Sequence, residues 1–85
     1  MRRPFIAGNW KMNLLRDEAI RLARGIADNC PSPGAVDVAV CPPFVYLESV
    51  RNSLQGSLVG LGAQNMHHEP EGAFTGEISG KMLVD

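Results

Sequence analysis

The hydrophobic positions along the chain follow two spacings in turn, and their alternation predicts three strands and three helices. Three short apolar or β-branched runs are typical of buried strands. The first begins at Phe5, and the other two cover residues 36–41 and 58–64. Apolar residues three and four apart, typical of amphipathic helices, cover residues 16–29, 45–55 and 78–84. Strands and helices that alternate in this way imply one parallel sheet with right-handed crossovers, so the predicted fold class is α/β.

Local signals set the ends of these elements. Pro42 and Pro43 stop the second strand, because neither proline can donate a hydrogen bond to a ladder. Gly56 closes the second helix, and Ser79 is the expected cap of the third. The first helix is expected to end before Pro31, Pro33 and Gly34. The positions expected to face the core are Ala19, Leu22, Ala23, Ile26 and Ala27 in the first helix and Tyr46, Leu47, Val50 and Leu54 in the second.

Composition and charge narrow the class of protein. Hydrophobic residues make up 45% of the 85 residues, which is normal for a globular domain, so the chain is one small domain at most. A net charge of −1 gives no electrostatic basis for binding nucleic acid or an anionic membrane. No run resembles a signal peptide or a membrane span. Cys30 and Cys41 form no C-x-x-C pair, so we expect reduced, structural thiols in a cytoplasmic protein.

The first strand runs directly into polar residues, and this stretch carries the candidate chemistry. Parallel sheets present functional groups at the carboxyl ends of their strands. Strand alternation would put Asn9 and Lys11 on one face with Phe5 and Ala7, and would put Ile6, Gly8 and Trp10 on the other. A lysine there without a partner is costly unless an anion meets it, which favours an anion-binding role. The alternative is that Lys11 reaches solvent where the strand stops.

A long segment, residues 66–77, separates the third strand from the third helix. Loops of this length in small domains are usually either functional or disordered, and the aromatic Phe74 within this one favours function. Phe74, between Gly72 and Gly76, is expected to meet a partner surface, and the alternative is that it folds back onto its own core. His67 and His68 lie close to Glu69 and Glu71 and so could hold a metal. Adjacent histidines on an extended chain point apart, so we expect solvated side chains and no metal site.

Three passages together resemble the triosephosphate isomerase family. They are Gly8-Asn9-Trp10-Lys11-Met12-Asn13, Cys41-Pro42-Pro43 and Gly72-Ala73-Phe74-Thr75-Gly76-Glu77-Ile78-Ser79, and they follow the family's order. The resemblance covers the whole chain. It implies an eight-unit (β/α)8 TIM barrel of which residues 1–85 form a single truncated segment of three parallel βα units. Element order alone fits a small doubly wound sheet equally well, and the resemblance decides for the barrel.

The resemblance also implies roles for individual residues. The family interconverts dihydroxyacetone phosphate and glyceraldehyde 3-phosphate without a cofactor or metal. Asn9 matches its substrate-binding amide, and Lys11 matches its catalytic, electrostatic lysine. The loop of the family crosses to the second subunit of a homodimer, where the threonine matching Thr75 supports the lysine matching Lys11. Phe74, Thr75 and Glu77 are therefore the expected dimer interface.

Two parts of the family's active site have no counterpart in these residues. The family's electrophile is a neutral histidine in a Gly-His-Ser-Glu-Arg-Arg run after the fourth strand, and its base is a glutamate on a later strand. We therefore expect the 85-residue chain alone to be inactive. The sheet face that lines the barrel interior carries Phe5 and Ala7 and would lie open to water. We expect that face to drive self-association into a dimer or higher oligomer.

Two further functions stay open from the residues alone. The chain could work as a complementing fragment that is active only with a separate carboxyl-terminal chain. It could instead be a small phosphate- or metal-binding module that uses Lys11 or the His67-His68 pair. Activity on adding the second chain would identify the first possibility, and calorimetry with phosphoglycolate and zinc would identify the second.

Overall fold

The structure, a computed structural model, describes residues 2–30 and 35–85 and has three parallel strands in the order β1-β2-β3. The strands are β1 (Phe5–Asn9), β2 (Asp37–Cys41) and β3 (Gly60–Leu61). The helices are α1 (Arg16–Asp28), α2 (Leu47–Ser53) and α3 (Gly80–Val84), and a short 3-10 turn, η1 (Phe44–Tyr46), precedes α2. This confirms the predicted alternation of strand and helix, and the order is that of successive βα units in a (β/α)8 barrel.

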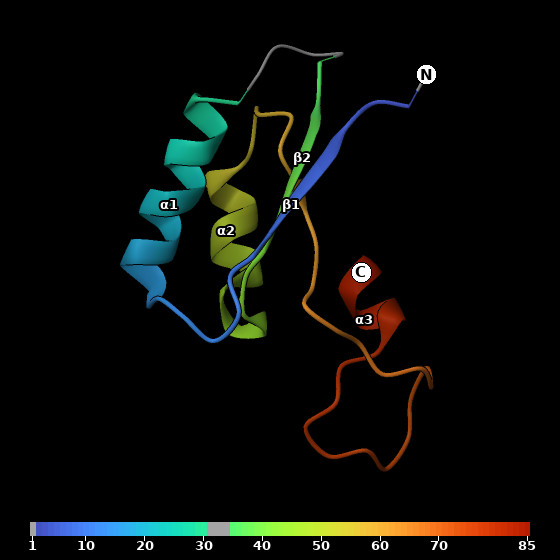
Figure 1. The fold of residues 1–85 in the computed structure, drawn as a ribbon. Helices are drawn as coiled ribbons and strands as arrows, with labels where there is room; N and C mark the ends of the chain where they lie inside the picture. Colours follow the sequence, from blue (N-terminus) through green and yellow to red (C-terminus); the bar gives the residue numbers. More distant parts are fainter. Residues whose placement is uncertain (1, 31–34) are drawn as a thin grey trace.

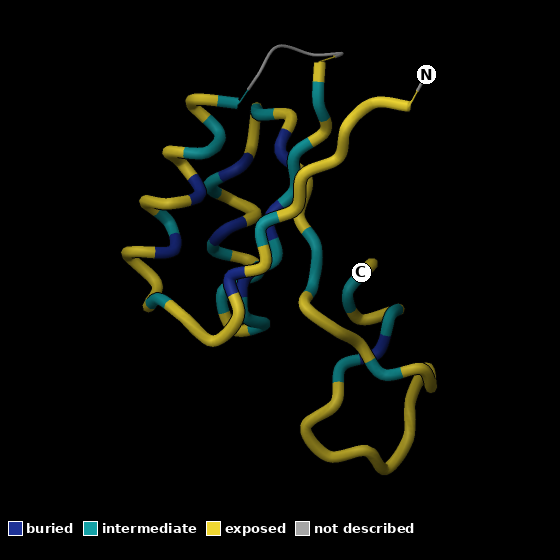
Figure 2. The backbone as a smooth tube through the Cα atoms, viewed as in Figure 1, coloured by how far each residue is buried: buried dark blue, intermediate teal, exposed yellow. Residues whose placement is uncertain are grey.

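Helices α1 and α2 lie side by side and cover one face of the sheet (Figure 1). The buried core lies between these helices and the strands, as the dark segments of Figure 2 show. Its apolar members are Trp10, Ala19, Ala23, Val40, Val50, Leu54 and Val59. Ala19 and Ala23 of α1 are fully buried and that helix packs mainly against α2, while Trp10 lies in the core just beyond the carboxyl end of β1.

The strand register decides which side chains share the uncovered face. Phe5 lies opposite Asp37, Ala7 opposite Ala39, and Ala39 opposite Gly60. Residues opposite each other point to the same side, so this face is lined mainly by small side chains, with Phe5 as its large apolar member. Phe5 is 66% exposed. The open face is therefore less hydrophobic than expected, because its alanine and glycine positions offer little area to bury.

Three elements are clearly shorter than predicted: β3, α2 and α3, which begins at Gly80 where residue 78 was expected. β3 covers Gly60–Leu61 where 58–64 was expected, although Gly62 N–H still donates to Val40 O at 2.9 Å. Beyond that bond the chain leaves the sheet. The glycines of this strand do have the expected close neighbours, since a Cβ at Gly62 would lie 3.1 Å from Cys41 Sγ. The second helix begins with η1, because Pro43 holds an extended backbone immediately before it.

Most of the expected helix ends and inward-facing positions agree with the structure, and Leu22 is the exception. α1 ends at Asp28 with Asn29 as its cap, and Pro31, Pro33 and Gly34 lie outside the described residues. Leu22, expected to face the core, is 42% exposed because α1 buries the stripe through Ala19 and Ala23 instead. Gly56 has φ 82, the left-handed conformation expected where it closes α2. The inward set of α2 is confirmed: Val50 and Leu54 are buried, and Tyr46 and Leu47 are half-buried.

The segment from residue 66 to residue 77 projects away from the sheet and carries no helix or strand, as predicted (Figure 1). It returns to α3 at Ser79, whose Oγ accepts from Met82 N–H at 3.3 Å, which confirms the predicted cap. Lys81 of α3 forms a 3.0 Å ion pair with Glu71 of the loop. Within the part of the chain that the structure describes, no helix is long and apolar enough to cross a membrane.

Candidate functional site

The turn after β1 carries Asn9 and Lys11 at the carboxyl edge of the sheet. Lys11 lies two residues beyond the strand and has φ 55, a left-handed conformation that is uncommon for any residue but glycine. The expectation that strand alternation extends to Lys11 is therefore wrong. A hydrogen bond joins the two residues instead: Lys11 N–H donates to Asn9 Oδ1 at 2.9 Å. The two residues are therefore neighbours in a turn, and the shared strand face expected for their side chains is not the geometry that joins them.

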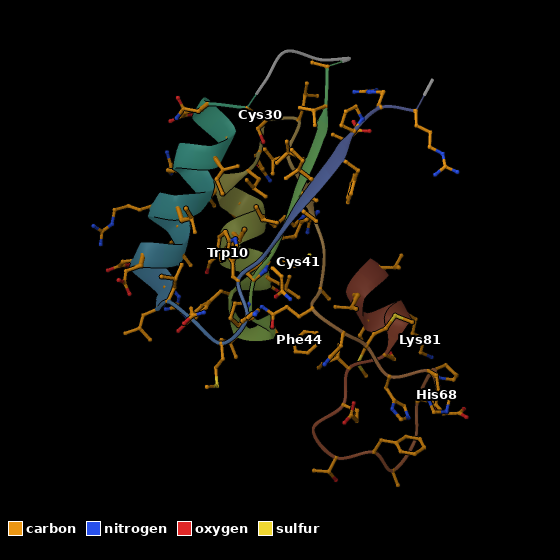
Figure 3. The ribbon with its side chains drawn as sticks, in the orientation of Figure 1. Trp10, Cys30, Cys41, Phe44, His68 and Lys81 are labelled. Atoms are coloured by element: carbon orange, nitrogen blue, oxygen red, sulfur yellow. The ribbon has the colours of Figure 1, made fainter. Side chains whose placement is uncertain are left out.

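Trp10 anchors this turn in the core. Its side chain is 8% exposed and lies between the strands and the helices (Figure 3). Trp10 N–H donates to Cys41 O at 3.2 Å, so the pairing of β1 with β2 continues one residue past the strand. Asn13 Nδ2 donates to Trp10 O at 2.9 Å. A Cβ at Gly8 would lie 3.5 Å from Trp10 Nε1, which confirms that these two residues share a face.

Gln64 completes the turn, and the sequence reasoning did not select it. Gln64 Nε2 donates to Lys11 O at 2.8 Å and to Cys41 O at 2.9 Å, and so joins residues far apart in the chain. The available signal was its position: Gln64 is a polar residue at the carboxyl end of the third predicted strand, as Asn9 is for the first. Its hydrogen-bonding partners are main-chain atoms, and a sequence pattern does not contain that information.

The turn after β1, with Asn9 and Lys11, is called the corner below. Neither the Lys11 ammonium nor the Asn9 amide N–H₂ has a hydrogen-bond or ion-pair partner among the described residues. Lys11 is exposed, and its ammonium has no ion pair with any carboxylate of residues 2–30 and 35–85. Asn9 uses its carbonyl oxygen on Lys11 N–H, so its amide N–H groups remain as donors. An ammonium and an amide donor on one tight turn are groups that bind a small oxyanion. The corner thus presents an ammonium and an amide donor, and residues 10–15 include no carboxylate or imidazole.

The projecting loop is organised around His67. The Phe74 ring lies against His67, with ring centroids 4.3 Å apart, and Phe74 is 45% exposed. The side chain thus packs on its own loop and still presents about half of its surface. Gly72 makes room for this packing, since a Cβ there would lie 2.7 Å from Phe74 Cε2. This arrangement combines parts of the two expectations for Phe74: the ring folds back onto the loop while remaining accessible to a partner.

The expectation for the two histidines was wrong in part. His67 and His68 do not point apart, since their ring centroids are 4.5 Å apart. The His67 side chain is 18% exposed, because Phe74 covers it, whereas His68 is 81% exposed and solvated as predicted. In the described residues, no three histidine, cysteine, aspartate or glutamate side chains are arranged to hold a metal. Cys30 and Cys41 are both half-buried and are not joined by a disulfide.

The residues predicted for a dimer interface are gathered at the loop, away from the corner. Glu77 N–H donates to Phe74 O at 3.1 Å, and Glu77 Oε2 lies 3.8 Å from His67 Nδ1. Thr75 lies in the same turn, which Gly76 allows with φ 86. The loop and the turn after β1 lie well apart in Figure 1. The structure therefore joins Asn9 with Lys11, and Phe74 with Glu77, in two separate places.

Comparisons with known proteins identify the family. A sequence model described as triosephosphate isomerase matches residues 4–85. Among curated proteins named triosephosphate isomerase, that of Carboxydothermus hydrogenoformans is 56% identical over 85 residues, which are 100% of this chain and 34% of that protein. The Rhodopirellula baltica protein is 49% identical over 84 residues, 99% of this chain and 33% of that protein. The chain thus spans about a third of the length of these relatives, and it belongs to the triosephosphate isomerase family.

Proposed function

We propose that residues 1–85 supply the substrate-anion corner of a triosephosphate isomerase, an enzyme of glycolysis and gluconeogenesis in the cytoplasm. In this proposal Asn9 donates to the triose phosphate, and the Lys11 ammonium neutralises negative charge on the bound substrate and on the enediolate that forms from it. The main support is that Lys11 is held on a fixed turn without an ion pair to any described carboxylate. A preorganised charge of this kind needs no reorganisation as substrate charge develops.

The test uses an exchange protein, in which this chain replaces the matching 85 residues of the Carboxydothermus hydrogenoformans relative. Lys11→Ala in the exchange protein is expected to lower kcat/KM by about 10²–10³-fold, the usual effect of removing one group that stabilises transition-state charge. The matched control is Arg24→Ala, which removes an exposed positive charge from α1, away from the corner. Equal kinetics for Lys11→Ala and Arg24→Ala would refute the assignment of Lys11.

The polypeptide of residues 1–85 is proposed to have no isomerase activity by itself. Proton transfer between adjacent carbons needs a base and an electrophile, each worth about 10²–10⁴-fold, and the corner offers neither. The two histidines of the sequence lie on the projecting loop, where His67 is covered by Phe74. A coupled assay on the purified polypeptide is expected to give no turnover. Turnover that copurifies with the chain and disappears in Lys11→Ala would contradict this.

We further propose that the projecting loop makes a homodimer, with Phe74, Thr75 and Glu77 at the interface. The loop that carries Thr75 extends from its own sheet and lies well apart from the turn after β1, which favours a contact between Thr75 and the Lys11 turn of a second copy. That turn is bordered by exposed apolar side chains suited to an interface, with Met12 95% and Val45 76% exposed. The Phe74 ring supplies the large, partly exposed aromatic group that interfaces favour.

Sedimentation of the exchange protein tests the interface. Phe74→Ala is expected to weaken dimerisation by at least about tenfold, since truncating a central aromatic anchor usually costs about 2 kcal/mol or more, roughly 30-fold. Val84→Ala is the matched control, because Val84 is an apolar residue of α3 that is 89% exposed. A Phe74→Ala protein that dimerises as tightly as Val84→Ala would remove Phe74 from the interface.

A further inference from the structure

Lys11 holds a backbone conformation that needs outside support. Its φ of 55 is left-handed, and a residue with a Cβ adopts this conformation at a cost of about 1–2 kcal/mol. Single residues in this region persist where neighbouring groups over-determine them. The turn after β1 therefore requires specific partners for the Lys11 peptide groups, and without them the lysine would relax to an ordinary conformation and carry its ammonium elsewhere.

The Lys11 backbone is held from both sides. Its N–H donates to Asn9 Oδ1 at 2.9 Å, and its carbonyl accepts from Gln64 Nε2 at 2.8 Å. The Asn9 bond is local and moves with the turn. The Gln64 bond comes from the chain that follows β3, across 53 residues of sequence, so it ties the Lys11 peptide itself to a distant part of the chain.

The same amide group also fixes the neighbouring strand end. Gln64 Nε2 donates to Cys41 O at 2.9 Å, and Cys41 O accepts from Trp10 N–H at 3.2 Å. The carboxyl ends of β1, β2 and β3 thus meet at one side-chain amide. Both acceptors are carbonyls, and the two hydrogens of the Gln64 amide N–H₂ provide one donor for each.

We infer that Gln64 is a positioning residue for Lys11: by donating to Lys11 O and Cys41 O, it holds the lysine backbone left-handed and aims the ammonium at the substrate anion. The inference has two parts. The structural half is that Gln64 controls the Lys11 backbone conformation, and it does not depend on the proposed function. The catalytic half is that this control affects turnover, and it rests on the proposed function. Gln64 does not touch the substrate in this scheme and acts only through Lys11.

Gln64→Met tests the structural half, because methionine keeps a side chain of similar length and has no donor. The readout is the nuclear Overhauser effect between the amide and α protons of Lys11 in the 85-residue chain, which is strong when φ is near +55 and weak in ordinary conformations. We expect a strong effect in the unaltered chain and a weak one in Gln64→Met. The control is Gln55→Met, since Gln55 is an exposed glutamine after α2. An unchanged Lys11 signal in Gln64→Met would overturn the inference.

The catalytic half is tested by a double-mutant cycle in the exchange protein. Gln64→Met is expected to lower kcat/KM by about 10–100-fold when Lys11 is present, since misplacing a catalytic group by about 1 Å can cost about 10². In the Lys11→Ala background the same substitution should change kcat/KM by less than about twofold, because it acts through an absent side chain. Equal losses in both backgrounds would mean a general structural role and overturn the inference. If Lys11→Ala alone leaves kcat/KM unchanged, the proposed function fails. The nuclear Overhauser effect at Lys11 in the 85-residue chain still tests whether Gln64 positions that residue.

Discussion

Replacing Lys11 by glycine and by alanine should give proteins of different stability, with glycine the more stable. Both substitutions remove the same ammonium and the same long side chain, so the difference between them isolates the backbone. Lys11 has φ 55, where alanine is strained and glycine is not. The Lys11 side chain is exposed and has no ion pair in the described part of the chain, so neither variant loses a packed contact that the other keeps.

The size of the difference follows from two opposing effects. A left-handed conformation costs a residue with a Cβ about 1–2 kcal/mol. Glycine loses more conformational freedom on folding, which costs about 0.5–1 kcal/mol relative to alanine. The strain at alanine outweighs the entropy lost by glycine at the middle of both ranges, so Lys11→Gly should have a free energy of unfolding about 0.75 kcal/mol higher than Lys11→Ala, within a range of about 0–1.5 kcal/mol.

Urea unfolding followed by tryptophan fluorescence measures this difference. Trp10 is the one tryptophan of the sequence, and it is 8% exposed, so its emission reports the loss of the core beside the turn. The control is the same pair of substitutions at Arg24, inside α1, where glycine should be less stable than alanine by about 1 kcal/mol. If Lys11→Gly is also less stable than Lys11→Ala, the left-handed backbone does not govern this turn and the reasoning is refuted.

Three other substitutions have definite expected outcomes. Gly25→Ala should raise the free energy of unfolding by about 0.5–1 kcal/mol, because Gly25 lies inside α1 with open space around its Cβ position; thermal or urea unfolding checks this, and a loss of stability would contradict it. Gly72→Ala should displace Phe74 from His67, since the new Cβ would lie 2.7 Å from the Phe74 ring and residue 72 has φ 144. Faster amide hydrogen exchange across residues 72–77 is expected, and unchanged exchange would contradict the prediction. Ser79→Ala should cost about 1 kcal/mol through loss of the bond from Met82 N–H, while Ser79→Thr retains it; equal stability of the two variants would exclude the cap.

The order of elements and the candidate corner were accessible from sequence because local physics decides them. The stripe through Ala19 and Ala23 and the break at Pro42 and Pro43 mark a helix and a strand end regardless of what surrounds them. Ser79 and Gly56 cap helices through their own side chain or backbone freedom, and both do so in the structure. Asn9 and Lys11 stood out because polar residues that directly follow a strand lie at the sheet edge where chemistry is presented. The apolar run before them predicted a buried strand, and this was wrong: β1 is mostly exposed, with no residue of Phe5–Asn9 buried.

Contacts between distant parts of the chain were decided only by the tertiary structure. The left-handed backbone of Lys11 and its bond to Gln64 depend on how the ends of β1 and β3 meet, which no local pattern records. The stacking of Phe74 on His67 depends on the path of the loop, so the rule that adjacent histidines point apart failed there. The length of β3 likewise depends on the path of the chain, because β3 pairs with only Ala39 and Val40 although β2 covers Asp37–Cys41. A single sequence shows which side chains are available for contacts. Which of them meet across many residues is decided only when the chain folds.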